Sequence, residues 1–467
     1  MDRNKKAIEN LQAKKRKKIV IYGAPCHLTT GNSKLVRFMA KAFQSAGHEV
    51  FNIGIDYNRP QIWYDGIPVM PSFFCETCGN SNKGSEESVQ KLVEYMTLLN
   101  PEFFIAVGDP YQMQQFGLGR LNLAKSKIKA LMYCTLDSEG VFCDENQKLA
   151  GRPSYIDICD RVISTSVFTQ EQLKKHLLCE SEMIHETIDL NNYSSISEDK
   201  KKELRKKYRF AEDAFIMYSG GRNIMRKRLF TLLDGAAKFI CETENTFLYL
   251  NIPVETSNSG QAYFPDVLNP QDFIKRVLKQ KYGRDLMSEG RMVFIQRGGL
   301  GHLEISESQN AELYQISDVY VTAGGAEGFG LMQCESLACG VPAVVPQSTT
   351  GKEIIGVSEN DAKSTAFSYG KGGLLTKCPT EHWEAYGLKQ DLTTPDNTYE
   401  AIKELHDNPE LRRTLAKDGK AYVKEMFNTE KFTNKWIDII NTTEKKVVEK
   451  ADEGFKKMEL GEKKNGK

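Results

Sequence analysis

Short apolar runs alternate with amphipathic helical patterns along most of this sequence, and that alternation limits the folds available to the chain. The run KIVIYGAP, which begins at Lys18, ends in a Gly-Pro loop and is typical of a buried strand. Residues 31–46 then place apolar side chains on one face of a helix, Gly47 ends it, and HEVFNIGI is the next strand. Further strands are predicted at FFIAVGD, KALMYCTL and RVISTS. Strands joined by helical crossovers predict a parallel sheet with helices on both faces.

The alternation is interrupted over residues 194–207, where the sequence becomes polar and strongly charged. It restarts with AFIMYSGG, and the strands that follow are TFLYLNI, MVFIQR, DVYVTAG and PAVVPQ. A chain of 467 residues also exceeds the roughly 250 to 300 residues at which one hydrophobic core stops growing. The sequence therefore predicts an α/β protein of two doubly wound, Rossmann-like domains facing across a cleft. Ligands of such sheets bind at the carboxyl ends of the strands.

Overall charge and hydropathy argue against other classes of protein. The chain has 63 Lys and Arg residues against 62 Asp and Glu residues, and this balance does not suggest a nucleic-acid-binding protein. No apolar run reaches the roughly 18 to 20 residues that cross a bilayer, and the N-terminus is too polar for a secretory signal. We therefore expect a cytoplasmic protein. The basic runs at 14–18 and 200–207 are expected to be solvated, although they leave contact with an anionic membrane surface open.

The 11 cysteines are scattered along the chain, which fits reduced thiols better than a disulfide framework. Cys75 and Cys78 form the close pair CETC. A zinc site with four protein ligands needs two further ligands, and no second close pair of cysteines supplies them, so a loop with free thiols is favoured.

The segment GGAEGFGLMQCESLACGVP, residues 324–342, carries two carboxylates, Glu327 and Glu335. Its glycines permit tight turns and close approach of the backbone to a ligand, while residues 331–339 can form a short helix. We therefore expect Glu327 in the loop before the helix and Glu335 on the helix. Carboxylates without a metal partner suit hydroxyl-rich ligands such as sugars and ribose, although for either acid alone a surface or loop position is the more usual explanation.

A second segment, SGGRNIMRK, follows the first strand of the second domain. Arg222 and Lys227 follow its glycine turn, at the head of the expected helix RKRLFTLLDGAAKF. Basic side chains beside a helix N-terminus neutralise a diphosphate and stabilise it as a leaving group. By itself such a cluster is also typical of a solvated surface.

Together these segments resemble the retaining glycosyltransferases of family 4, which have the GT-B fold of two Rossmann-like domains. EGFGLMQCESLACGVPAVV is similar to the family's Glu-x7-Glu signature, EGFGL..LEAMACG.PVV, and GGRNIMRK is similar to its donor-phosphate motif, GRL...K. TTGNSKLVRFMAKAFQSAGHEV resembles the N-terminal glycine loop and strand, and IHETIDLNNY stands where IPNGVD...F lies. The resemblance extends over residues 18–440.

The resemblance implies a role for each residue of these motifs. Arg222 and Lys227 would hold the donor diphosphate and, with Glu327 at the transferred sugar, would form the catalytic centre. Glu335 would bind the ribose. Further contacts would come from the turn before the helix and from a loop of the first domain, through Gly328, Phe329, Gly330, Leu331, Gly31 and Asn32. The donor would be a nucleotide diphosphate sugar, and the resemblance implies neither a metal nor another cofactor.

The resemblance also implies how the chain is divided. The expected parts are a basic extension over 1–17, an N-terminal acceptor-side domain over 18–200, a C-terminal nucleotide-sugar-binding domain over 208–420, a helix returning to the first domain over 421–442, and a charged tail over 443–467. The returning helix would bury Phe432, Trp436 and Ile439.

Several positions depart from the family pattern. Family members often carry a histidine beside the donor sugar, but CTLDSEG has none, so that either Asp137 or Glu139 takes its place or its function is absent. STTGKE replaces the usual glycine pair before a glutamate, here Glu353. His27 and His302 stand alone near cleft loops, and single histidines are more often structural than catalytic.

The expected activity is that of a metal-independent hexosyltransferase, which moves a sugar from a nucleotide diphosphate sugar to an acceptor hydroxyl with retention of configuration. The acceptor, whether glycan, lipid, protein or small molecule, is not defined by these motifs. A nucleotide-sugar epimerase or phosphorylase of the same fold stays open. A degenerate subunit that binds nucleotide sugar without turnover is favoured by the missing histidine and opposed by the two glutamates.

Overall fold

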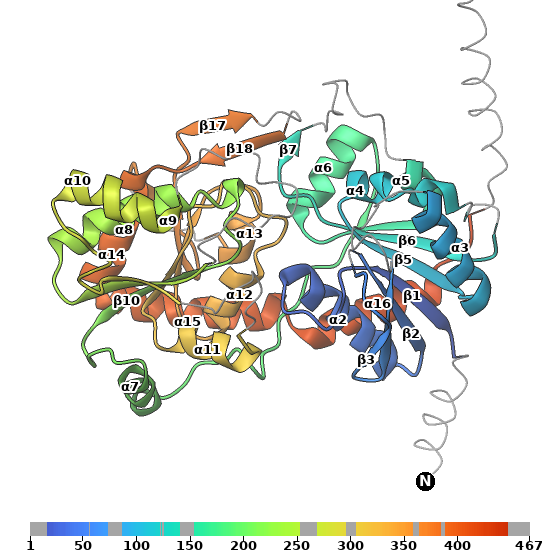
Figure 1. Ribbon diagram of the computed structural model, residues 1–467, viewed down its shortest axis with the longest axis horizontal. Coiled ribbons are helices and arrows are strands. Elements are labelled where there is room, and N and C mark those ends of the chain that lie inside the picture. The colour runs from blue at the N-terminus through green and yellow to red at the C-terminus, as the bar shows by residue number, and fades with distance from the viewer. Residues whose placement is uncertain are drawn as a thin grey trace, which may run out of the picture. The chain divides into compact units, whose positions relative to one another are not determined.

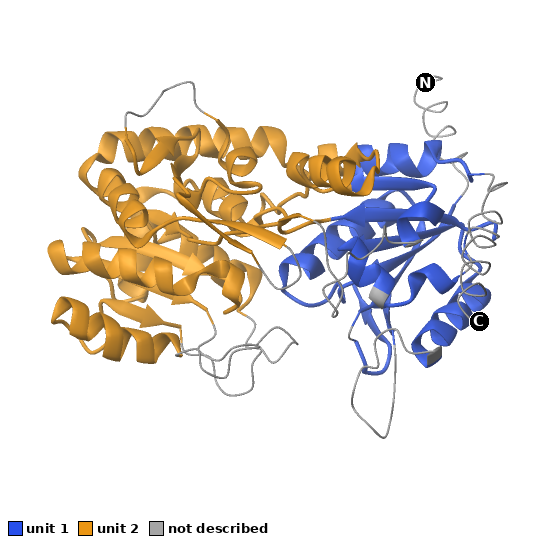
Figure 2. Ribbon diagram, turned by 90° about the horizontal axis from the view of Figure 1, so that it is seen from above, with its two compact units in different colours: residues 1–134, 152–163, 433–467 blue, residues 135–151, 164–432 orange. Residues whose placement is uncertain are grey.

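The computed structural model has an α/β architecture (Figure 1). The residues it describes are 16–55, 57–72, 86–121, 123, 126–140, 154–252, 269–295, 305–357, 364–383 and 388–446. The chain forms two compact units (Figure 2), of which unit 1 contains residues 1–134, 152–163 and 433–467, and unit 2 contains residues 135–151 and 164–432. Residues 164–200 thus belong to unit 2. The sequence places them in the first domain, 18–200, because the strand pattern restarts only after residue 207, and these domain limits stay a prediction.

Unit 1 is built on parallel strands with buried apolar side chains. β1 (Lys18–Gly23) pairs with β2 (Glu49–Gly54) and β5 (Phe103–Gly108), and β5 pairs with β6 (Lys129–Cys134). The further strands are β3 (Ile62–Tyr64), β4 (Ile67–Pro71) and β8 (Arg161–Ser164). Within unit 1 these strands have the order β3-β4-β2-β1-β5-β6-β8, and β9 (Glu182–Met183) belongs to unit 2. The central position of β1 and the parallel pairing are those of a doubly wound sheet.

The helix expected after the first strand is α2 (Gly31–Ser45). Thr30 caps its N-terminus, because the Thr30 side chain accepts a hydrogen bond from the Ser33 N–H at 3.3 Å. Leu35, Met39 and Phe43 lie on its buried face. The other helices of this part of the chain are α3 (Glu86–Leu99), α4 (Pro110–Gln115), the 3-10 helix η1 (Leu118–Leu121) and α5 (Ser154–Ile158).

Two helices occupy the region where one returning helix was expected. α15 (Pro409–Met426) and α16 (Thr429–Thr442) are separated by two residues, Phe427 and Asn428. At the break, the Phe427 carbonyl accepts a hydrogen bond from the Thr187 hydroxyl at 2.8 Å, and the Asn428 side chain accepts one from the Lys431 N–H at 2.8 Å. Phe432, Trp436 and Ile439 of α16 are buried, which confirms the predicted face. Within unit 1, the Trp436 ring packs edge-on against Phe43 and Tyr133, with ring centroids 5.8 and 5.0 Å apart.

Unit 2 contains a second, seven-stranded sheet of order β12-β11-β10-β13-β14-β16-β15. Its strands are β10 (Phe215–Gly220), β11 (Thr246–Asn251), β12 (Met292–Phe294), β13 (Val319–Val321), β14 (Ala343–Pro346), β15 (Phe367–Tyr369) and β16 (Gly373–Thr376). All neighbours pair in parallel except β15 with β16. The two Rossmann-like sheets confirm the predicted fold class.

Helices accompany the strands of unit 2 (Figure 1). They are α6 (Val167–Leu177), α7 (Glu198–Lys207), η3 (Met225–Lys227), α8 (Leu229–Glu242), α9 (Pro270–Asp272), the π-helix η4 (Phe273–Leu278), α10 (Lys279–Tyr282), α11 (Glu307–Gln315), α12 (Leu331–Ala338), α13 (Gly351–Ile355) and α14 (Pro395–Asp407), together with α15. A small antiparallel sheet joins β7 (Glu139–Gly140) to the hairpin of β17 (Thr380–Trp383) and β18 (Leu388–Leu392). Among the described residues, no helix combines the length and apolar character needed to cross a membrane.

Candidate active site

Two turns meet at the carboxyl edge of the second sheet. β10 and β13 are parallel neighbours, so the turns that follow them, 221–228 and 322–330, leave the sheet at the same edge. The Gly325 N–H donates to the Arg226 carbonyl at 2.8 Å and joins the two turns directly. The helix expected from Arg226 onward starts later, since residues 225–227 form the 3-10 turn η3 and α8 begins at Leu229.

Glu327 is at the centre of this junction. The Lys227 ammonium donates to Glu327 Oε1, and Arg226 Nη1 lies 3.3 Å from Glu327 Oε2. The side chains of the three residues are between 15% and 23% exposed, so the cluster is mostly shielded from water. The structure therefore brings Glu327 and Lys227, both predicted from the sequence, into direct contact.

Arg226 is a site residue that the sequence reasoning missed. Its guanidinium also lies 3.0 Å from Asp137 Oδ2 and donates to the Ala326 carbonyl at 2.8 Å. Asp137, one of the two acids at the place of the family histidine, thus joins the cluster through Arg226. A signal for Arg226 was available in the motif itself, because SGGRNIMRK has a second basic residue directly before Lys227.

The charges around Glu327 favour its ionised form. Burial by itself raises the pKa of Glu327, but the attraction of Lys227 and Arg226 outweighs burial, and the pKa lies below its usual value. Glu327 is therefore a carboxylate at neutral pH. An ionised carboxylate accepts hydrogen bonds, as binding of sugar hydroxyls requires.

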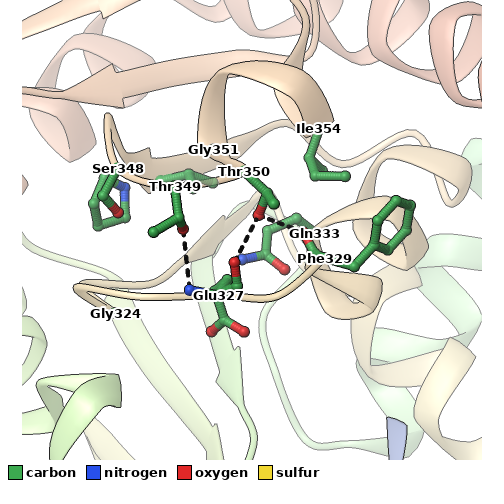
Figure 3. Close-up of a pocket in the computed structure, with 11 residues that line it drawn as sticks. Gly324, Glu327, Phe329, Gln333, Ser348, Thr349, Thr350, Gly351 and Ile354 are labelled. Atoms are coloured by element: carbon green, nitrogen blue, oxygen red, sulfur yellow. Dashed lines mark hydrogen bonds between the residues drawn. The ribbon is translucent and has the colours of Figure 1, made fainter. Parts of the chain in front are cut away.

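Two threonines hold the backbone of Glu327 (Figure 3). Thr349 Oγ1 accepts from the Glu327 N–H at 3.1 Å, and the Thr350 hydroxyl donates to the carbonyls of Glu327 and Phe329 at 3.3 and 2.6 Å. The Glu327 carboxylate points away from both threonines. These residues line one pocket with Gly324, Gln333, Val345, Pro346, Ser348, Gly351 and Ile354. STTGKE thus supplies hydroxyl contacts where the family pattern has a glycine pair.

The turn after Glu327 requires glycine at two positions. A Cβ at Gly328 would lie 2.8 Å from Asp137 Oδ1 and closer still to Thr135 Oγ1. Gly330 has a φ of +115° and directly precedes Leu331, the first residue of α12. Phe329, which lies between the glycines, is buried and packs edge-on against Phe427 at 5.3 Å. Contacts of residues 328–331 with a donor sugar stay a prediction.

Glu335 lies on α12 as expected, but in surroundings different from those of Glu327. It is 2% exposed and accepts hydrogen bonds from the Tyr314 hydroxyl at 3.0 Å and from Asn310 Nδ2 at 3.3 Å. Both partners come from α11. A carboxylate held by neutral donors is consistent with an anchor for hydroxyl groups, and its proposed role at the ribose stays a prediction.

The charges of the Glu327 cluster also act on Arg222: burial lowers the pKa of Arg222, Arg226 lowers it further, and Asp137 and Glu327 raise it. The residue keeps an exposed surface, and it makes no ion pair with the part of the chain that the structure describes. Gly31 and Asn32 are exposed in the first turn of α2 in unit 1, and their proposed role in closing a cleft stays a prediction.

Three other candidates have structural partners. Glu139 forms ion pairs with Lys175 at 2.7 Å and Lys389 at 3.0 Å, and these partners lower its pKa. Glu353 accepts from the Val167 N–H at 2.9 Å and bonds His185 Nε2 at 2.5 Å. The His27 ring packs edge-on against Tyr57, with centroids 5.4 Å apart.

His302, Cys75 and Cys78 lie outside the described residues. Within the described ranges, no three His, Cys, Asp or Glu side chains are grouped so that they could hold a metal ion.

Comparison with known proteins finds similarity to glycosyltransferases. Residues 301–363 match the family model "Glycosyl transferases group 1". An uncharacterised glycosyltransferase of Methanocaldococcus jannaschii is 26% identical over 217 residues, which are 44% of this chain and 52% of that protein. The chain thus spans about half the length of that curated relative.

The fold is shared with solved structures over most of the chain. Sucrose-phosphate synthase from Thermosynechococcus elongatus aligns with a TM-score of 0.66 and 16% identity, covering 91% of this chain and 98% of that one. HepE from Anabaena, solved with UDP and glucose, aligns with a TM-score of 0.62 and 15% identity, covering 91% and 100%. The chain therefore has the two-domain GT-B fold.

Proposed function

We propose that the chain is a glycosyltransferase that moves a sugar from a nucleotide diphosphate sugar to an acceptor hydroxyl with retention of configuration. The observation that carries this proposal is the cluster of Lys227, Arg226 and Glu327 at the carboxyl edge of the second sheet. It combines cations for a diphosphate with a carboxylate for sugar hydroxyls. The match of residues 301–363 and the GT-B fold support the same function.

The charges of the cluster suit a leaving diphosphate. Negative charge grows on the diphosphate as the sugar leaves, and cations placed there beforehand stabilise that charge where water is largely excluded. Lys227 would exchange Glu327 for a phosphate oxygen, and exposed Arg222 would add a second contact. Glu327, released from Lys227, would then accept hydrogen bonds from the sugar.

The donor is expected to be a nucleotide diphosphate sugar. Because HepE has been solved with UDP-glucose, that compound is the first donor to test. A panel of UDP-glucose, UDP-N-acetylglucosamine, ADP-glucose and GDP-mannose would be incubated with glycan, lipid and small alcohol acceptors. Released nucleotide, and the anomeric configuration of each product by NMR, are the measurements.

The products separate the proposed reaction from its rivals. Release of nucleotide with an α-linked product from an α-linked donor is expected, and Lys227→Ala is the matched inactive control. A sugar altered while still attached to nucleotide would indicate an epimerase, and dependence on phosphate would indicate a phosphorylase. A β-linked product from an α-linked donor would contradict retention.

A further inference from the structure

Glu186 is a buried acid that the function described so far does not use. It follows β9 in the segment IHETID, and its residue is 6% exposed. Within the part of the chain that the structure describes, its carboxyl makes no hydrogen bond and no ion pair. A largely buried carboxyl without a partner is costly, and such a group calls for a functional explanation.

The backbone on both sides of Glu186 is held in place. His185 bonds Glu353 at 2.5 Å, and its ring packs edge-on against Phe427 with centroids 5.2 Å apart. On the other side, the Thr187 hydroxyl donates to the Phe427 carbonyl at 2.8 Å. These flanking contacts restrict where the Glu186 side chain can go, so its position is set before any ligand arrives.

Glu186 belongs to the surroundings of the Glu327 turn. The ring of its neighbour His185 lies 6.2 Å from the ring of Phe329. The Ile184 N–H donates to the Ser164 carbonyl, and the nearby Ser166 hydroxyl donates to the Gly328 carbonyl at 3.3 Å. The segment 184–187 is therefore packed beside the loop that carries Glu327.

The charges that act on Glu186 are negative. Burial, followed by the carboxylates of Asp137 and Glu327, raises the pKa of Glu186 to about 8. The neighbouring thiol of Cys334 on α12 has a raised pKa and brings no charge at neutral pH, and Glu353 is bonded to His185. Glu186 thus keeps its proton at neutral pH and lies within reach of the charge of an ionised Glu327.

We propose that Glu186 is a specificity-determining residue that binds an oxygen of the transferred sugar through its O–H group. This inference rests on the proposed function. Glu327 can accept hydrogen bonds but cannot donate them, whereas a neutral carboxyl donates one and accepts another. The pair would recognise a sugar by offering a donor and an acceptor to different ring substituents.

The test measures how much the sugar adds to binding of the nucleotide. Calorimetry would give Kd for three probe pairs: UDP with UDP-glucose, ADP with ADP-glucose, and GDP with GDP-mannose. The quantity compared is the Kd of the free nucleotide divided by the Kd of the nucleotide sugar. A high ratio means that the sugar strengthens binding, and the pair with the highest ratio in the wild-type chain is used. Binding does not require turnover, so a changed ratio without sugar transfer would leave this inference standing and reject the proposed function.

Three variants give distinct expectations at about pH 7. Glu186→Ala should lower the ratio about fivefold to tenfold, which corresponds to one hydrogen bond, and leave the Kd of the free nucleotide unchanged. Glu186→Gln keeps a donor and an acceptor in the same volume and should retain the ratio. Glu182→Gln is the matched control and should leave the ratio unchanged, because Glu182 is exposed on β9.

A pH series separates the loss of the Glu186 proton from an effect of the substitutions on the structure. Above about pH 8, wild-type Glu186 loses its proton, so the wild-type ratio should fall while that of Glu186→Gln stays constant. Equal pH dependence in wild type and Glu186→Gln overturns the proposal, as does an unchanged ratio in Glu186→Ala. A wild-type chain that binds every nucleotide sugar no more tightly than its nucleotide overturns it as well.

Discussion

Arg226 links two acids that come from distant parts of the sequence. Its guanidinium reaches Glu327 at 3.3 Å, Asp137 at 3.0 Å and the Ala326 carbonyl at 2.8 Å. A planar guanidinium with five donors can serve several acceptors at once, which a lysine ammonium does less well. Arg226 therefore holds Glu327 in position, and Lys227, which donates to the other carboxylate oxygen, is the cation proposed to bind the diphosphate.

At Glu327, charge matters more than size. Glu327→Gln keeps the volume but removes the carboxylate that pairs with Lys227 and Arg226. We expect sugar transfer to fall about 100-fold or more, since an interaction with the reacting sugar is lost. Affinity for UDP should stay equal or rise, because Lys227 is then free to bind phosphate. Calorimetry and a nucleotide-release assay measure the two effects, and a loss of UDP affinity as large as the loss of rate would contradict this role.

The two predicted phosphate ligands should differ in strength. Lys227 is 23% exposed at its side chain, whereas Arg222 is exposed. Lys227→Ala should weaken UDP binding by roughly 1.5 to 3 kcal/mol, the range for a charge-assisted contact that is partly desolvated. Arg222→Ala should cost less, because solvent screens an exposed charge. Lys238→Ala on α8 is the control, and unchanged UDP affinity in Lys227→Ala would remove Lys227 from the phosphate site.

At the scale of elements, α16 completes the core of unit 1 with residues from the far end of the chain. Its residue Trp436 is fully buried against Phe43 of α2 and Tyr133 of β6. The Lys17 ammonium also donates to the Ile440 carbonyl at 2.7 Å. Aromatic side chains of this size bury large apolar areas, so the helix contributes to stability as a core element.

Removal of the Trp436 ring tests that contribution. Trp436→Ala should lower the free energy of unfolding by about 3 to 5 kcal/mol, the usual cost of deleting a buried aromatic side chain. Asp438→Ala, at an exposed position on the same helix, should change it by less than about 0.5 kcal/mol. Urea denaturation followed by circular dichroism measures both variants. Similar stabilities of the two would show that α16 is peripheral to the core.

For the whole molecule, the buried acid Glu186 links stability to pH. Its pKa rises from 4.5 to about 8 on folding, so the folded chain retains a proton that the unfolded chain has lost. Stability from this group is therefore present below about pH 4.5 and falls as pH rises toward about 8. Glu186→Gln removes this titration. Between about pH 5 and pH 8, the melting temperature of Glu186→Gln should rise relative to that of the wild type. An equal change of melting temperature with pH in both proteins would exclude the raised pKa.

Dependence on metal is a second property of the whole molecule. We expect sugar transfer to persist in excess EDTA, because Lys227 and Arg222 are proposed to meet the diphosphate charge that a divalent cation would otherwise meet. The nucleotide-release assay with and without EDTA, followed by addition of Mg²⁺ or Mn²⁺, measures this. Loss of activity in EDTA that either cation restores would overturn the assignment of the cations.

Local patterns in the sequence were sufficient for the fold class and for the placement of two acids. Alternating strand and helix periods predicted the two parallel sheets, since periodicity depends on near neighbours in the chain. The glycines around Glu327 and the helical pattern after Leu331 placed one acid in a loop and the other on α12, as the structure has them. The burial of Trp436 followed in the same way from the apolar face of its helix.

Contacts between segments far apart in the chain depended on the tertiary structure. Arg226 and Asp137, which are 89 positions apart in the sequence, form an ion pair. No local pattern near either residue predicts this pair. Glu335 is bonded by Tyr314 and Asn310 of α11, and Glu186 is buried beside the Glu327 turn, although both acids have the polar character of surface residues. Sequence by itself determined which elements form, because hydrophobic period and turn residues act locally. Packing decided which charges pair and which carboxyl stays protonated, because burial and electrostatics depend on neighbours in space.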